Sequence, residues 1–314
     1  MPPIRTLTAL CLTAALAAPA ARADSPIPAP AASAPAELAG VPFGTMYLDW
    51  RDESRSRSLP VRLYLPDAAA AGKPVPLVVF SHGIGGSRMG YSYLGRYWAS
   101  QGYASLHLQH VGSDRNLWAG NPFGLVGRLR DAAQDKEAIA RVLDLHFALD
   151  QLLAGPLGSR IDADRIVAAG HSYGANTTLL AAGAQVERAG QKLDFRDARI
   201  KAAIILSAPP FYGETDPANV LAGITVPTLH VTATEDIIRI PGYYSGATDR
   251  VAVFDATGSP RKALAVFAGG SHSMFTDRSG TGGMALNPKV KEATRALSLA
   301  FLKSVFDGDT EALP

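Results

Sequence analysis

After residue 40, short apolar runs alternate with longer stretches of helical periodicity. The runs 76–81, 104–108 and 202–206 are apolar almost throughout, which predicts strands that are buried on both faces of a sheet. Over 131–153, apolar side chains recur about every 3.6 residues, which predicts a long amphipathic helix. Buried strands separated by helices are typical of a mostly parallel sheet with helices on both faces. The pattern therefore predicts the α/β fold class.

The remaining elements follow the same alternation. We expect strands at 47–51, 61–65, 76–81, 104–108, 165–169, 202–206, 228–231 and 263–267, and helices at 89–100, 131–153, 173–182 and 289–305. The first two strands are joined by a charged turn and are expected at the edge of the sheet. Residues 109–130 are rich in Gly and Asn, and we expect a surface loop or a partial lid there. No internal repeat or second core is evident, so 41–314 is interpreted as one domain.

The first 23 residues have the pattern of a secretory signal peptide. Arg5 precedes an apolar run at 7–18, and Ala21-Arg22-Ala23 forms an A-x-A cleavage site. The run is too short to span a membrane as a helix. We therefore expect cleavage after Ala23 and a secreted or periplasmic protein. Residues 24–40 are rich in Ala, Pro and Ser, which indicates a linker.

Composition excludes several classes of site. The formal net charge is +2 and no basic run stands out, so nothing indicates a nucleic-acid partner. The one cysteine, Cys11, lies within the expected signal peptide. The processed chain would then have no disulfide, thiol nucleophile or cysteine metal site. We expect no metal or organic cofactor and no stable membrane insertion, and the oligomeric state is left open.

The strongest chemical signal is the pentapeptide G-H-S-Y-G at 170–174, which contains Ser172. It follows an expected buried strand and precedes an expected helix. A serine on such a tight turn has its hydroxyl pushed out above the sheet, and the glycines on either side remove Cβ atoms that would clash. Ser172 is the candidate nucleophile. The alternative is a glycine-rich turn whose serine merely caps the helix.

A second glycine-rich segment, S-H-G-I-G-G-S at 81–87, directly follows an expected strand. Backbone amides of such a loop, together with the amide after the nucleophile, can bind the oxyanion that forms during acyl transfer. We therefore expect the amides of Ile84 and Tyr173 to form an oxyanion hole. A phosphate-binding loop is the alternative, but no G-K-[ST] follows. His82 is interpreted as a residue that stabilises the loop.

Chain order selects the general base. In hydrolases with this serine turn, the acid and then the histidine follow the nucleophile. Only His230 and His272 lie beyond Ser172. His230 falls inside an expected strand and is interpreted as a packing residue. His272 lies in a glycine-rich loop after the last expected strand, so it is the candidate base.

The acid is chosen from three carboxylates. Asp236 follows the expected strand 228–231 and could accept a hydrogen bond from the ring of His272. Its neighbour Glu235 is the main rival, and Asp216 is a weaker one. Any of them could instead be a solvated turn residue. Asp236 is the preferred candidate.

These motifs carry a resemblance. Over 61–305 the chain resembles the α/β-hydrolase superfamily, and F-S-H-G-I-G-G-S-R with G-H-S-Y-G is similar to platelet-activating-factor acetylhydrolase-like, dienelactone-hydrolase-like and cutinase-like enzymes. Dienelactone hydrolases use cysteine where this chain has Ser172. Platelet-activating-factor acetylhydrolases place the acid at the strand end corresponding to 204–208, which has no carboxylate here. Cutinase-like enzymes commonly carry a disulfide, which the processed chain could not form.

The expected activity is hydrolysis of a small or polymeric carboxylic ester through an acyl-enzyme intermediate. A peptidase or amidase, a cofactor-free perhydrolase and a non-catalytic binding protein are the alternatives. Aromatic and methionine side chains near the loops could form an acyl or alcohol pocket, and the candidates are Tyr91, Trp118, Phe211, Tyr212, Met274 and Phe275.

Overall fold

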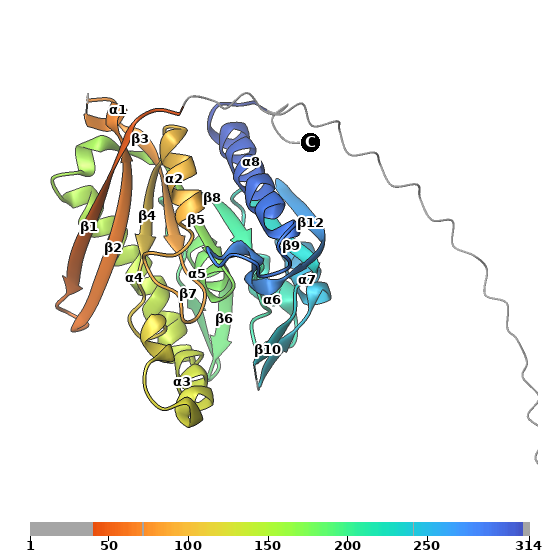
Figure 1. Ribbon diagram of the computed structural model, residues 1–314. Coiled ribbons are helices and arrows are strands. Elements are labelled where there is room, and N and C mark those ends of the chain that lie inside the picture. Colours follow the sequence, from red (N-terminus) through yellow and green to blue (C-terminus); the bar gives the residue numbers. More distant parts are fainter. Residues whose placement is uncertain (1–39, 71, 241, 310–314) are drawn as a thin grey trace, which may run out of the picture. The chain divides into compact units, whose positions relative to one another are not determined.

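The computed structural model describes residues 40–70, 72–240 and 242–309 (Figure 1). The expected signal peptide and all of the expected linker except Gly40 lie outside these residues. The helices are α1 (Asp67–Ala70), α2 (Ser92–Ser100), α3 (Leu125–Ala132), α4 (Asp135–Ala154), α5 (Tyr173–Ala182), α6 (Pro217–Leu221), α7 (Ala247–Ala256) and α8 (Leu286–Phe306). The strands are β1 (Phe43–Asp52), β2 (Arg57–Pro66), β3 (Val75–Ser81), β4 (Ala104–Leu108), β5 (Ile161–His171), β6 (Gln185–Arg188), β7 (Gln191–Asp194), β8 (Ile200–Leu206), β9 (Thr228–Glu235), β10 (Ile238–Ile240), β11 (Tyr243–Ser245) and β12 (Lys262–Ser271).

Eight strands form the central sheet in the order β1-β2-β4-β3-β5-β8-β9-β12. From β4 to β12, each strand is parallel to its neighbour, whereas β2 is antiparallel to both β1 and β4. The α/β class and the mostly parallel sheet are therefore confirmed. The placement of both early strands at an edge was wrong for β2, which lies between β1 and β4.

Helices cover both faces of this sheet (Figure 1). Side chains of β5 alternate between two cores, with Ile166 and Ala168 in one and Val167 and Ala169 in the other, as the two-residue period of a strand requires. The first core contains residues of α4 and α5, and the second contains residues of α2 and α8. Burial on both faces explains why the central strands are continuous apolar runs.

The expected helix over 131–153 was wrong at its start. The chain forms two helices there, α3 and α4, and they are separated at Ala133 and Gln134. Gln134 has extended backbone, with φ −70° and ψ 155°, so it interrupts the hydrogen-bond ladder. α4 then begins with Asp135 and Glu137, acidic residues that suit the positive end of a helix dipole.

Residues 109–130 form short helical turns and not one irregular loop. The 3-10 helices Arg115–Trp118 and Pro122–Gly124 lead into α3. Trp118 donates its ring N–H to the carbonyl of Gly85 at 2.8 Å, and Leu117 and Leu129 pack with Ile84. This segment therefore contacts the loop that follows β3.

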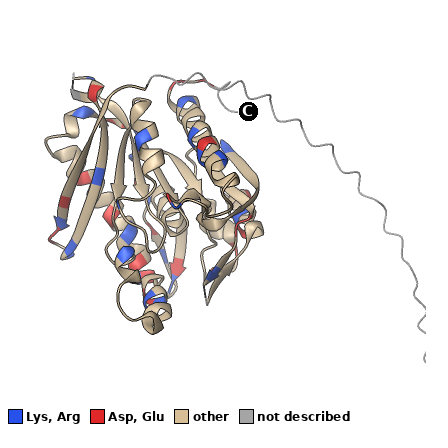
Figure 2. Ribbon diagram, viewed as in Figure 1, with Lys and Arg blue, Asp and Glu red and all other residues tan. Residues whose placement is uncertain are grey.

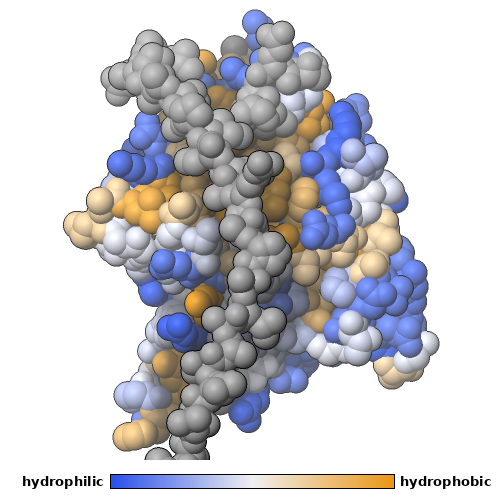
Figure 3. Space-filling model, turned by 90° about the vertical axis from the view of Figure 1, so that its right-hand side faces the viewer, coloured by the Kyte–Doolittle hydropathy of each residue, from blue (hydrophilic) through white to orange (hydrophobic). Residues whose placement is uncertain are grey.

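Charged residues of both signs are interspersed on the helices and on β1 and β2 (Figure 2). On the face shown in Figure 3, the described residues form hydrophilic areas with smaller apolar areas between them. None of the described helices is both long enough and apolar enough to cross a membrane.

Candidate active site

Ser172 lies on a strained turn between β5 and α5. Its backbone has φ 56° and ψ −123°, a conformation that non-glycine residues rarely adopt. A Cβ at position 174 would overlap the carbonyl oxygen of Ser81, and one at position 170 would overlap the backbone of Gly174. The sequence therefore needs glycine at both positions, and the serine is held at the carboxyl end of the sheet.

The structure brings Ser172, His272 and Asp236 together from the ends of three strands. Nε2 of His272 lies 2.8 Å from Oγ of Ser172, and Nδ1 lies 2.7 Å from Oδ1 of Asp236. If Nδ1–H donates to the carboxylate, Nε2 is left to accept from the serine hydroxyl. This arrangement can activate the hydroxyl as a nucleophile.

Asp236 is fully buried and has a full set of partners. Thr232 donates its hydroxyl to Oδ2 at 2.8 Å, Ser207 also donates to Oδ2, and a guanidinium nitrogen of Arg250 lies 3.5 Å from Oδ1. Burial by itself raises the pKa of Asp236, but the hydrogen bond and charge of His272 and the charge of Arg250 outweigh burial and hold that pKa well below its usual range. The group at this site is therefore a carboxylate.

The rival acids lie elsewhere. Glu235 is exposed beside Asp236, and no hydrogen bond joins it to His272 within the described residues. Asp216 caps α6 by accepting from the amide of Ala218 at 2.9 Å. Neither is placed to orient the imidazole.

Ser207 is a site residue that the sequence did not reveal. It follows β8 with φ 57°, in the left-handed region. Its hydroxyl donates to Asp236 and also lies 2.8 Å from Nδ1 of His272. Ser207 therefore contacts both Asp236 and His272. These two residues and Ser172 form the candidate proton relay, called the relay below. Its signal in the sequence is its place within 204–208, at the end of an expected strand.

Two backbone amides are the candidate donors of an oxyanion hole. Those of Ile84 and Tyr173 have no acceptor among the described residues. The loop that carries Ile84 is held by a bond from the amide of Gly85 to the carbonyl of Ser113 at 2.8 Å. Because Gly85 has φ 72°, a non-glycine residue there would be strained.

A second residue that sequence reasoning missed, Arg141 of α4, contacts both segments that carry these amides. Its side chain is fully buried and donates to the carbonyl of His82 in the loop after β3. It also donates to Thr177 of α5 at 3.0 Å, and its guanidinium carbon lies 4.5 Å from the ring centroid of Tyr173. Arg141 thus connects the two halves of the candidate oxyanion hole.

Beneath this loop lies a buried ionic cluster. Arg57 pairs with Glu137 at 3.0 Å and with Asp144 at 2.8 Å. His110 bridges Asp144 and the hydroxyl of Ser81, with Nδ1 3.0 Å and Nε2 3.1 Å from the two oxygens. These contacts attach the end of β3 to α4, which gives the loop a rigid base.

His171, between the glycine and the nucleophile, connects the loops of the site. Its Nε2–H donates to the carbonyl of His272 at 2.9 Å, which leaves Nδ1 to accept from the hydroxyl of Tyr91 at 2.8 Å. The same hydroxyl accepts from the amide of Gly83 at 3.3 Å. Burial, with the charge of His272 as a smaller cause, lowers the pKa of His171 to about 3, so it stays neutral near pH 7.

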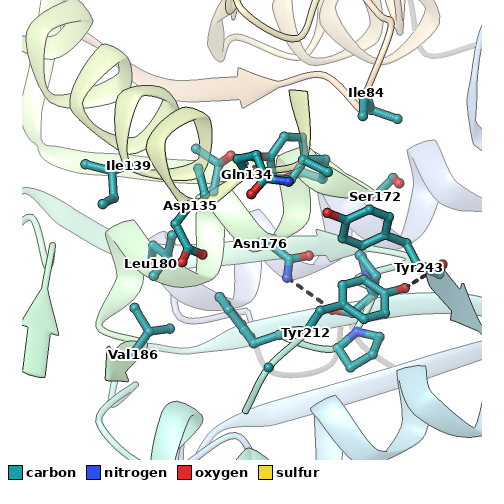
Figure 4. Close-up of a pocket in the computed structure, with 18 of the residues that line it drawn as sticks. Ile84, Gln134, Asp135, Ile139, Ser172, Asn176, Leu180, Val186, Tyr212 and Tyr243 are labelled. Atoms are coloured by element: carbon teal, nitrogen blue, oxygen red, sulfur yellow. Dashed lines mark hydrogen bonds between the residues drawn. The ribbon is translucent and has the colours of Figure 1, made fainter. Parts of the chain in front are cut away.

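Ser172 opens into a cavity of about 340 Å³ (Figure 4). Phe211 and Tyr212 line it, as expected, together with residues of α4, α5 and the β6–β7 hairpin. The other four candidates for pocket residues do not line this cavity: Tyr91, Met274 and Phe275 are buried in the core, and Trp118 packs on Gly85. Among the described residues, no group of His, Cys, Asp or Glu could hold a metal ion.

Comparisons with known proteins support the fold. Residues 56–116 match the model of the family "Platelet-activating factor acetylhydrolase, isoform II". A search of the curated proteins found no significant match. The chain is similar to the ferulic acid esterase from Streptomyces cinnamoneus, with 23% identity and a TM-score of 0.62 over 88% of this chain and 93% of that one. It is also similar to a cold-adapted esterase from an Arctic intertidal metagenomic library, with 15% identity and a TM-score of 0.53 over 82% and 95%. The chain has the α/β-hydrolase fold.

Proposed function

We propose that the protein is a serine hydrolase that cleaves carboxylic esters. The observation that carries this proposal is the continuous line of contacts from Ser172 through His272 to Asp236, at a strained turn beside two free amides. The similarity of 56–116 to a platelet-activating factor acetylhydrolase family and the fold shared with two esterases support an ester as substrate.

In the first half-reaction, Oγ of Ser172 attacks the ester carbonyl while His272 accepts its proton. The carboxylate of Asp236 stabilises the imidazolium. The amides of Ile84 and Tyr173 bind the negative oxygen of the tetrahedral intermediate, and one such donor is worth about 3 kcal/mol. The intermediate collapses, the carbon–oxygen bond to the alcohol breaks, and His272 returns the proton to the alcohol oxygen.

The second half-reaction repeats these roles with water. His272 takes a proton from water, the hydroxide attacks the acyl-serine, and the carboxylic acid leaves as Ser172 recovers its proton. Every proton that His272 accepts is returned within the same half-reaction. The chain's own side chains and amides supply each of these steps.

The test is Ser172→Ala. It should lower kcat for a soluble short-chain ester by about 10⁶-fold, because the serine and the histidine act as one unit, and thermal unfolding should change little. Organophosphate treatment followed by mass spectrometry should place one adduct on Ser172 in the wild type and none in the variant. Full activity in the variant, or an adduct elsewhere, would refute the proposal. Faster cleavage of matched amides would instead favour the peptidase or amidase, and peroxide-dependent activity with acetate the perhydrolase.

We also propose that the protein is exported to the periplasm or the medium. The basis is the sequence pattern that ends at Ala23. N-terminal sequencing of secreted or periplasmic protein should begin at Asp24. Recovery only from the cytosol, with Met1 intact, would overturn this proposal without affecting the chemistry.

A further inference from the structure

A buried arginine of α7 contacts the acid of the relay. Arg250 is only 3% exposed, and Nη2 of its guanidinium lies 3.5 Å from Oδ1 of Asp236. The same oxygen accepts from Nδ1 of His272 at 2.7 Å. One carboxylate oxygen is therefore shared between a guanidinium, which is always charged, and an imidazole, which becomes charged when it accepts a proton.

The guanidinium is held in place from the wall of the cavity beside Ser172. Its Nη1 donates to the hydroxyl of Ser245 at 2.9 Å, and Ser245 is fully buried. The same hydroxyl accepts from Tyr212 at 3.1 Å, a residue that lines the cavity. Hydrogen bonds outside the relay therefore fix the position of this positive charge.

The contact between Arg250 and Asp236 is an ion pair without a hydrogen bond. Nη2 and Nε of Arg250 have no hydrogen-bond partner among the described residues, and no second carboxylate pairs with the guanidinium there. Two neighbouring acids are placed otherwise, because Asp249 accepts from the amide of Gly246 at 2.7 Å and Glu235 is exposed. A buried cation needs a negative charge nearby, and Asp236 supplies it.

The other groups that contact this part of the relay are uncharged. His171 donates to the carbonyl of His272, and its pKa of about 3 keeps it neutral near pH 7. Burial raises the pKa of Tyr212, so its hydroxyl keeps its proton. The remaining partners of Asp236 are hydroxyl groups. Within the described part of the chain, Arg250 is therefore the one permanent cation that pairs with the acid.

The charge of Arg250 is close enough to act on His272. Nδ1 of His272 and Nη2 of Arg250 contact the same oxygen, at 2.7 and 3.5 Å, so these nitrogens lie within about 6 Å of each other. A positive charge at that distance favours the carboxylate form of Asp236 and disfavours the imidazolium form of His272. In mild acid the imidazole therefore takes up a proton from solvent less readily.

We propose that Arg250 is a positioning residue of the relay, whose charge keeps His272 able to accept the proton of Ser172 at lower pH than the relay would otherwise allow. The proposal rests on the proposed ester hydrolysis and specifies how its pH range is set. The same charge also disfavours the imidazolium that forms as Ser172 reacts. Arg250 therefore widens the pH range of activity and does not raise the maximum rate.

The acid limb of the pH profile of kcat/KM tests this proposal, because it reports ionisation in the free enzyme. Arg250→Met removes the charge and keeps a long, unbranched side chain. The pH of half-maximal kcat/KM for 4-nitrophenyl butyrate should rise by about one to two units, the shift that a unit charge about 6 Å away causes at an effective dielectric of 20. At the pH where the wild type has half of its maximum, the variant should have about a tenth or less of its own.

Matched variants separate the charge of Arg250 from its packing. Arg250→Lys keeps the charge and should bring the profile most of the way back to that of the wild type. Arg250→Gln is neutral but can still donate to Ser245, so it should shift the profile as Arg250→Met does, and it gives the answer if Arg250→Met does not fold. Arg165→Met is the control for net charge, because Arg165 pairs with Asp307 and lies near the start of β5, whereas the site lies beyond its end. Its profile should equal that of the wild type.

The outcomes separate this proposal from the one it rests on. A lower rate with an unshifted profile in the two neutral variants would mean that Arg250 only packs against Asp236, and would overturn the proposal while leaving the esterase intact. An equal rise in Arg250→Lys and in the neutral variants would overturn it as well, because the charge would then not be the cause. Failure of the wild type to hydrolyse the ester, with no organophosphate adduct on Ser172, would overturn the proposed function itself.

Discussion

Replacing Asp236 by asparagine removes one negative charge from a fully buried site without changing the side-chain shape. The carboxylate accepts from His272 through Oδ1 and from Ser207 and Thr232 through Oδ2. Asparagine has one oxygen and one NH₂ group, so it can accept a hydrogen bond either from His272 or from the hydroxyls of Ser207 and Thr232, but not from both. The outcome therefore depends on which side receives the oxygen.

The surroundings favour the oxygen at the Oδ1 position. Arg250 lies 3.5 Å from that atom and repels an NH₂ group there, whereas the hydroxyls of Ser207 and Thr232 can rotate to accept from NH₂. His272 then keeps its productive tautomer, and the loss is that of the charge alone. Two unit charges about 4 Å apart interact by roughly 4 kcal/mol at an effective dielectric of 20. That energy corresponds to a fall in kcat of about 10³-fold.

The assay is kcat on a soluble short-chain ester, measured for Asp236→Asn and for the control Glu235→Gln beside it. The control should resemble the wild type because Glu235 is exposed. A loss of about 10⁴-fold would mean that NH₂ faces His272 and imposes the wrong tautomer. A near-normal rate for Asp236→Asn, with a large loss for Glu235→Gln, would refute the assignment of the acid.

Two further predictions concern residues outside the relay. Arg141→Lys should lower kcat by about tenfold to a hundredfold with little change in KM, because lysine cannot hold both the loop after β3 and α5; a change confined to KM or to thermal stability would contradict a positioning role. Burial and the charge of Lys262 lower the pKa of His230 to about 3 in the folded protein, whereas the pKa of an unfolded histidine is about 6.5. Between these two pH values the unfolded state binds one proton more than the folded state, so the free energy of unfolding falls as the pH drops from about 6.5 towards 3. His230→Leu should reduce that slope by about 1.4 kcal/mol per pH unit in urea unfolding between pH 6 and 4, and an unchanged slope would refute the prediction.

The sequence predicted those parts of the molecule whose backbone conformation is determined by residues within one short segment. The turn at Ser172 needs glycine at 170 and 174 because backbone atoms pass within a Cβ's reach, and that need is visible in five residues. The strand 104–108 and the helix 173–182 were correct to the residue, since burial on both faces and a sharp turn define their ends.

The missed features depend on contacts between distant segments. Arg141 lies within an amphipathic helix, and nothing in its neighbourhood indicates that its side chain reaches the loop after β3. The β6–β7 and β10–β11 hairpins and helices α6 and α7 lack strong apolar periodicity and were not predicted. The break at Gln134 was missed because the apolar spacing continues across it, although the backbone at Gln134 is extended and not helical.

Ser207 provides the sharpest test of how the relay is built. It follows β8, the first strand of the central sheet after the nucleophile helix. In platelet-activating-factor acetylhydrolases, which this chain resembles, this place carries the acid. Its hydroxyl is 2.8 Å from Nδ1 of His272, and its φ of 57° lies in a region that aspartate tolerates better than most residues. A carboxylate introduced here should therefore reach His272.

We expect Ser207→Asp to lower activity in the wild type and to raise it in the Asp236→Asn variant. In the wild type, Ser207→Asp places a second carboxylate against Asp236, and because two adjacent like charges disfavour ionisation, activity should fall. In Asp236→Asn, the same substitution restores a negative charge beside His272 and should recover about tenfold to a hundredfold in kcat/KM, a coupling within the range of contacting residues. Thermal unfolding of all four proteins identifies any variant that fails to fold. If Ser207→Asp lowers activity equally in both backgrounds, a carboxylate at 207 cannot replace that of Asp236, and the relay depends on the position of Asp236 as well as on its charge.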